Sequence, residues 1–204
     1  MIFLDYNNYI RARDAAWRCL IDCGISFLPT KLSVICHHYN VDIMKNSDLS
    51  DHEMRLSHGQ RGKLIFSKGK HYIIVDDSET HQAQRYTIAH ELGHLIIPTS
   101  DEYEAERFAI GILAPACVLW GCNIHSAEDI AMICNISQAS SEIRAERMET
   151  LYKRNKFLTS PLERQVFDNF SEFIKNNRRP ITVALNKSDG FVVLISLFSE
   201  ELID

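Results

Sequence analysis

The 204-residue chain is predicted to be an α+β protein, because helical and strand-like patterns occupy separate stretches of it. Apolar residues recur at helical spacing in most of the chain. Residues 63–76 instead carry two short apolar runs around Lys68-Gly69-Lys70, which is typical of a β-hairpin. A hydrophobic content of 46% and a charged content of 24% are ordinary for a globular protein. A chain of this length can bury a full core without disulfides.

The first half of the chain predicts two helices, the hairpin and a third helix. Gly24 is placed to stop the first helix, Pro29 precedes the second, and Pro98 closes the third. Residues 40–57 are mixed and polar and give no assignment. The expected elements are Tyr9–Gly24, Thr30–Tyr39, Lys63–Ser67, His71–Asp76 and Gln82–Ile96.

The second half predicts mostly helices. An acidic stretch at residues 101–104 favours a helix start, because acids suit the N-terminal dipole, and this helix should end before Pro115. Ser126 and Asp129 are spaced as a capping box. Beyond the acidic helix, the expected helices are Ser126–Ile133, Ser137–Tyr152 and Pro161–Lys175, followed by strands at Ile181–Leu185 and Phe191–Phe198.

The pattern H-E-x-x-H at residues 90–94 is the strongest chemical signal. His90 and His94 lie one helical turn apart on one face, where two imidazoles can bind one zinc ion. Glu91 then lies close enough to act as the general base for an attacking water. The pattern lies within a helix with an apolar stripe beside the histidines. Gly93 is unfavourable inside a helix and suggests close approach of another backbone or of substrate.

A third protein ligand must come from outside this pattern, because catalytic zinc generally takes three. The next helix offers Glu102, Glu104 and Glu106. Glu102 and Glu104 are about 200° apart on a helix, so both cannot point at one metal. Physical reasoning alone does not choose between them. The sequence also leaves undecided which residue donates a hydrogen bond to the oxyanion. The candidates by proximity in sequence are Tyr86, Tyr103, His81 and Arg85.

Three motifs in succession resemble the ImmA/IrrE family of metallopeptidases. They are R-Y-T-I-A-H-E-L-G-H at residues 85–94, E-Y-E-A-E-R-F-A at residues 102–109 and Leu113-Ala114-Pro115. The resemblance implies a zincin-like core with the small hairpin packed on the H-E-x-x-H helix. It also implies Zn²⁺ held by His90, His94 and Glu104, with Glu91 as general base, and a transcriptional repressor of the helix-turn-helix type as the substrate. The predicted organisation is a zinc metallopeptidase domain at residues 1–152, which includes the helices of residues 126–152, and a C-terminal extension at residues 153–204.

The helices of residues 126–152 have the shape of a helix-turn-helix, which alone would suggest DNA binding. Arg144 and Arg147 are balanced by Glu142, Glu146 and Glu149, and the chain carries a net charge of −5. This balance opposes contact with phosphates, so direct DNA binding is not expected. The alternative function is a regulatory DNA- or protein-binding module, antitoxin-like, whose zinc site is structural or vestigial.

Targeting and redox signals favour a cytoplasmic protein. The short apolar run Ile2-Phe3-Leu4 has no positive region before it, so we expect no signal peptide, and no stretch is long enough to span a membrane. The six cysteines form no C-x-x-C pair and are expected to be reduced thiols.

Overall fold

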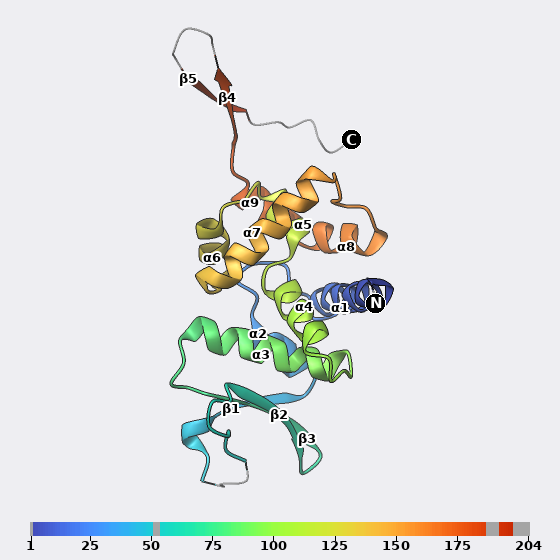
Figure 1. The fold of residues 1–204 in the computed structure, drawn as a ribbon, viewed down its shortest axis with the longest axis vertical. Coiled ribbons are helices and arrows are strands. Elements are labelled where there is room, and N and C mark those ends of the chain that lie inside the picture. Colours follow the sequence, from blue (N-terminus) through green and yellow to red (C-terminus); the bar gives the residue numbers. More distant parts are fainter. Residues whose placement is uncertain (1, 51–53, 187–191, 198–204) are drawn as a thin grey trace.

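The computed structural model describes residues 2–50, 54–186 and 192–197 (Figure 1). A small sheet lies at one end of the molecule, helices α3 and α2 lie next to it, and the remaining helices lie beyond them (Figure 1). The mixed α+β class is therefore confirmed. The helices are α1 (Ile2–Asp22), α2 (Leu32–His38), α3 (His81–Ile96), α4 (Glu102–Leu113), α5 (Ala116–Gly121), α6 (Ala127–Cys134), α7 (Gln138–Lys153), α8 (Pro161–Asn169) and α9 (Ser171–Asn177), with a short 3₁₀ turn at Asn46–Asp48.

The sheet contains the predicted hairpin and one strand that the sequence did not reveal. β2 (Gly62–Ser67) pairs antiparallel with β3 (Lys70–Val75), and β1 (Val41–Lys45) pairs parallel with β3 on its other side. The central strand β3 buries Ile73, Ile74 and Val75. β1 lies in the stretch left unassigned, because only Val41 of its residues is buried and no alternation of apolar residues marks it. β2 forms the opposite edge of the sheet, next to α3.

The two central helices pack closely because small residues lie between them. A Cβ atom on Gly93 of α3 would lie only 3.0 Å from Cα and 3.1 Å from the carbonyl oxygen of Ala105 in α4. The close approach expected at Gly93 is therefore that of another backbone. On α4, a Cβ atom on Gly111 would lie 2.7 Å from the Cβ of Ala16 in α1. Helix α4 is thus packed between α3 and α1, and its residues face both.

The pair α6–α7 is the predicted helical hairpin. Ser126 accepts a hydrogen bond from the amide of Asp129, Ser137 caps α7 in the same way, and Asn135 adopts the left-handed conformation between the helices. The arginines of α7 point into the protein. Arg144 is 8% exposed and donates to the carbonyl of Ile110, and Arg147 donates to the hydroxyl of Tyr9. These contacts agree with a packed hairpin.

The C-terminal part differs from expectation in one respect. The single helix predicted over Pro161–Lys175 is broken at Phe170, so the prediction of one continuous helix is wrong. The backbone turns at Phe170 because its fully buried side chain belongs to the same apolar core as α1, α4 and α5. Strands β4 (Ile181–Asn186) and β5 (Val192–Leu197) pair antiparallel. The predicted strand ends Phe191 and Phe198 lie outside the described residues.

Two features of the described residues complete the fold. None of their helices is long and apolar enough to cross a membrane. All six cysteines are free thiols.

Candidate metal centre and active site

Two histidines of α3 face each other across one helical turn. The Nε2 atoms of His90 and His94 lie 3.0 Å apart, and the side chains are only 16% and 18% exposed. Thr80 caps the start of this helix through the amide of Ala83. The predicted pair is thus brought together in a partly enclosed position.

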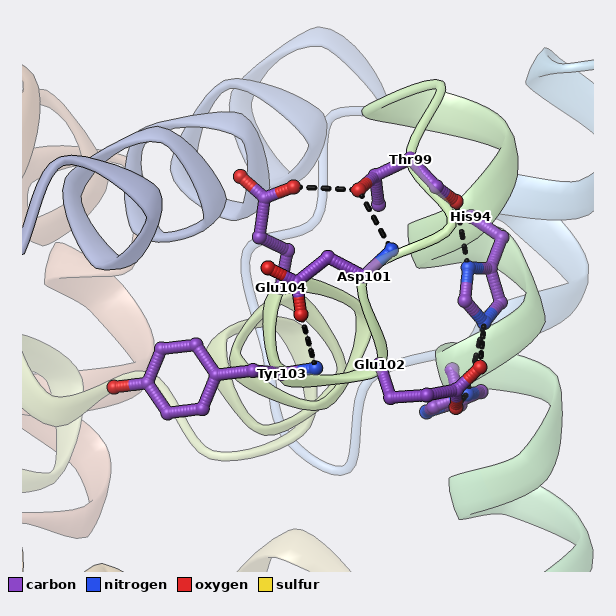
Figure 2. Close-up of polar contacts among 7 residues, drawn as sticks. His94, Thr99, Asp101, Glu102, Tyr103 and Glu104 are labelled. Carbon is purple, nitrogen blue, oxygen red and sulfur yellow. Dashed lines mark hydrogen bonds and ion pairs between the residues drawn. The ribbon is translucent and has the colours of Figure 1, made fainter. Parts of the chain in front are cut away.

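The backbone of the following turn orients His94. Its Nδ1 lies 2.8 Å from the carbonyl oxygen of Thr99, which is only an acceptor (Figure 2). Nδ1 therefore carries the proton in the neutral ring, and Nε2 presents a lone pair toward His90. A backbone carbonyl that fixes the tautomer in this way is the usual second partner of a metal-binding histidine.

The first residue of α4 supplies the carboxylate of the cluster. Glu102 Oε2 lies 3.0 Å from His90 Nε2, and Oε1 lies 3.6 Å from His94 Nε2 (Figure 2). One ligand atom from each of these three residues lies within 4.8 Å of the others. Two imidazoles and a carboxylate form a ligand set typical of catalytic zinc. Both Nε2 atoms face the same carboxylate, so the residues present fit a divalent metal of this kind.

Glu104, the predicted third ligand, lies outside this cluster in the structure. Its side chain is 1% exposed and points away from the histidines toward α1 (Figure 2). Glu104 Oε2 accepts hydrogen bonds from Arg11 of α1 and, at 2.6 Å, from the hydroxyl of Thr99. The physical reason is helical geometry: residues two apart point in nearly opposite directions, and Glu102 already faces α3.

Glu91 lines the same pocket as His90, His94 and Glu102, next to the edge strand β2. The backbone amide of Leu64 in β2 donates a hydrogen bond to its carboxylate. Burial raises the pKa of Glu91, while His90, His94 and this amide oppose the shift. A carboxylate with a raised pKa is a stronger base than one in open water, which suits proton transfer.

Two adjoining pockets are lined by His90 and Glu91. The first, of about 590 Å³, is lined by Glu91 and all three candidate metal ligands, and by residues 62–64 of β2. The second, of about 560 Å³, shares His90, Glu91 and Gly62 with the first and extends toward Ser137 and Ser140 at the start of α7. Both pockets reach Gly62 at the start of β2, so the cluster is open to solvent beside the edge of the sheet.

Of the four candidate oxyanion donors, three are engaged elsewhere. The guanidinium of Arg85 donates to the carbonyls of Thr30 and Asn135, and Tyr103 lies under the guanidinium of Arg107. His81 lies 3.4 Å from the side-chain amide of Asn135. Tyr86 alone of the four lines the second pocket. Burial raises its pKa to about 12, so its hydroxyl keeps a proton to donate.

The sequence missed three residues that support the site. Thr99 orients His94 and holds Glu104, Arg11 pairs with Glu104, and the amide of Leu64 holds Glu91. No motif marks these roles, because each depends on a contact between separate elements.

Comparison with known protein families gives a match over the middle of the chain. Residues 36–127 match the family model Peptidase_M78, described as IrrE N-terminal-like domain. The match runs from the end of α2 to the start of α6 and includes His90, Glu91, His94 and Glu102. Searches of curated proteins and of solved structures gave no match. The ImmA/IrrE resemblance of the sequence motifs is thereby confirmed.

Proposed function

We propose that the protein is a zinc-dependent endopeptidase, because residues 36–127 match the IrrE N-terminal-like domain model Peptidase_M78. The observation that carries the proposal is the convergence of His90, His94 and Glu102, with Glu91 on the same pocket wall. A bound zinc ion would polarise a peptide carbonyl and lower the pKa of the attacking water. The three named side chains would hold the ion.

The residues of the chain then account for proton transfer and positioning. Glu91 accepts a proton from the water as it attacks the carbonyl and later delivers it to the departing amine. The amide of Leu64 keeps the Glu91 carboxylate in place. The hydroxyl of Tyr86 is the best-placed donor to the negative charge that develops on the carbonyl oxygen. The β2 edge beside the pocket would bind the substrate backbone as an added strand.

We propose a transcriptional repressor of the helix-turn-helix type as the substrate, and the cytoplasm as the place of cleavage. Support comes from the ImmA/IrrE resemblance, since repressor cleavage is the activity that it implies. The inward contacts of Arg144 and Arg147 also disfavour direct DNA binding as the main role of α7.

The direct test is co-expression with candidate helix-turn-helix repressors from the same genome, with repressor fragments as the readout. We expect fragments with the wild-type protein and none with Glu91→Gln, which keeps the shape of the side chain but cannot accept the proton. Glu106→Gln is the matched control, because Glu106 is exposed and lines neither site pocket. Undiminished cleavage by Glu91→Gln would remove Glu91 as the base.

A further inference from the structure

A third pocket lies between α1, α4, α7 and the segment leading to α8. Its volume is about 310 Å³, and it shares no lining residue with the two pockets around His90. Apolar residues, among them Ile110, Ile143 and Leu151, form part of its wall. Its basic lining residues are Arg13, Arg107, Arg144, Arg147, Arg154 and Lys156.

Most of this positive charge is not neutralised by the protein. Arg13 pairs with Asp14 at 2.7 Å. The other five basic residues form no ion pair with any residue in the described part of the chain. Glu163 is the acidic residue of the lining, and its carboxylate accepts a hydrogen bond from the amide of Thr159. The pocket thus carries a large excess of positive charge although the whole chain is acidic.

Three of the lining arginines each have a buried guanidinium nitrogen that is not hydrogen-bonded to any described residue. The Nε atoms of Arg107, Arg144 and Arg147 are each buried and have no hydrogen-bond partner among the residues that the structure describes. Arg144 is more than nine-tenths buried, and its guanidinium donates a hydrogen bond to the carbonyl of Ile110. Burial lowers the pKa of Arg144, and the charges of Arg147 and Arg107 act in the same direction. Neighbouring buried cations are unfavourable unless an anion compensates them.

We propose that this pocket binds a compact phosphate-bearing molecule, such as a nucleoside phosphate or pyrophosphate. The planar donor fork of arginine matches phosphate oxygens, and several forks around one cavity match a group with more than one negative charge. The volume lies at the small end of ligand pockets, which suits a small molecule. The apolar wall offers a surface for a part of the ligand that carries no charge.

A nucleic acid fits these observations less well. The arginines of α7 are recessed, and the outer positions of the same helix carry Glu142, Glu146 and Glu149, which are exposed. A phosphate backbone approaching α7 from outside would meet these acids first. The charge lies within the cavity, where a small anion can enter.

Calorimetric titration of the full-length protein tests the inference, with inorganic phosphate, pyrophosphate, AMP, ADP and a duplex DNA as separate probes. The informative variant is Arg154→Gln/Lys156→Gln, because both side chains line the pocket and are exposed to solvent. The matched control is Arg18→Gln/Lys175→Gln, which removes the same charge from exposed positions outside the pocket. The readout is binding alone, so failure of the proposed peptidase activity would not affect it.

We expect at least one of the small phosphates to bind with a stoichiometry of one per chain. The rim variant should weaken that binding roughly tenfold or more, and the control should leave it unchanged. The four small probes distinguish a site for free phosphate from one for a nucleotide. Absence of binding by all four, equal weakening in both double variants, or binding of the duplex alone would each overturn the inference.

Discussion

The choice of Glu102 over Glu104 as the third metal ligand gives the sharpest prediction. Glu102 and Glu104 are two residues apart, yet the Glu102 side chain is 73% exposed beside the histidines and Glu104 is 1% exposed beside Arg11. Replacing each by alanine should therefore affect different properties. Glu102→Ala should remove most of the response to zinc while leaving the metal-free protein about as stable as wild type. Glu104→Ala should destabilise the metal-free protein and leave the response to zinc in place.

The expected sizes follow from binding linkage. Zinc at 100 times its dissociation constant stabilises the folded state by about 2.7 kcal/mol. For a chain of this length that corresponds to a rise in Tm of about 5–11 °C. Loss of a direct ligand should weaken binding by about 100-fold or more, since loss of a supporting residue alone reaches that range. The same zinc concentration then stabilises the folded Glu102→Ala variant by at most about 0.4 kcal/mol, which corresponds to a rise in Tm of about 1–2 °C.

The effect of Glu104→Ala has a different origin. Its carboxylate accepts hydrogen bonds from Arg11 and Thr99, but Arg11 is half exposed, and Glu104 Oε1 has no hydrogen-bond partner in the described part of the chain. Because of these two facts, we expect Glu104→Ala to lower the free energy of unfolding of the metal-free protein by only about 1–2 kcal/mol. Tm should fall by about 2–8 °C without zinc. The increment on adding zinc should remain that of the wild type.

Differential scanning calorimetry with and without zinc, together with metal analysis of the purified proteins, measures both quantities. Glu106→Ala is the control for removing a carboxylate from α4, because Glu106 is exposed and lines neither site pocket. If Glu104→Ala loses the zinc increment and Glu102→Ala keeps it, the assignment of the third ligand drawn from this structure is refuted.

Two further predictions concern how α3 is held. Gly93→Ala should lower the free energy of unfolding by about 1–3 kcal/mol through overpacking against Ala105, although alanine is the better helix former, and an increase measured by urea denaturation would contradict the close packing. Arg85→Met should lower it by about 1–3 kcal/mol, because the carbonyls of Thr30 and Asn135 lose their donor. An unchanged denaturation midpoint for this variant would show that water replaces the guanidinium without loss.

Elements with strong local signals were predictable from the sequence. The hairpin has its apolar runs and turn, and α6 and α7 have serine caps whose hydrogen bonds the structure contains. β1 was missed because it is an edge strand with one buried residue. The break at Phe170 was missed because the helical spacing of apolar residues continues through it. Its cause is the place of that side chain in a core built from distant helices.

The candidate site likewise has one part that the sequence predicts and another that depends on contacts between separate elements. The spacing of His90 and His94 is a property of one helix, so the sequence predicts that they converge. The hydrogen bond from the amide of Leu64 to Glu91 joins β2 to α3, and no local pattern contains it. The choice between Glu102 and Glu104 depends on which face of α4 lies against α3, which is likewise a property of the assembled fold.

Small residues nevertheless mark the two faces of α4. Ala105 lies against Gly93 of α3, and Glu102 is three residues before it, on the same face of the helix. Gly111 lies against α1, and Glu104 is seven residues before it, again on one face. The close packing of α4 on its two neighbours therefore directs one carboxylate to the histidines and the other to Arg11. Of the two acids, Glu102 is the one that lies on the same face of α4 as Ala105, which packs against α3. Only an acid on that face can reach the two histidines.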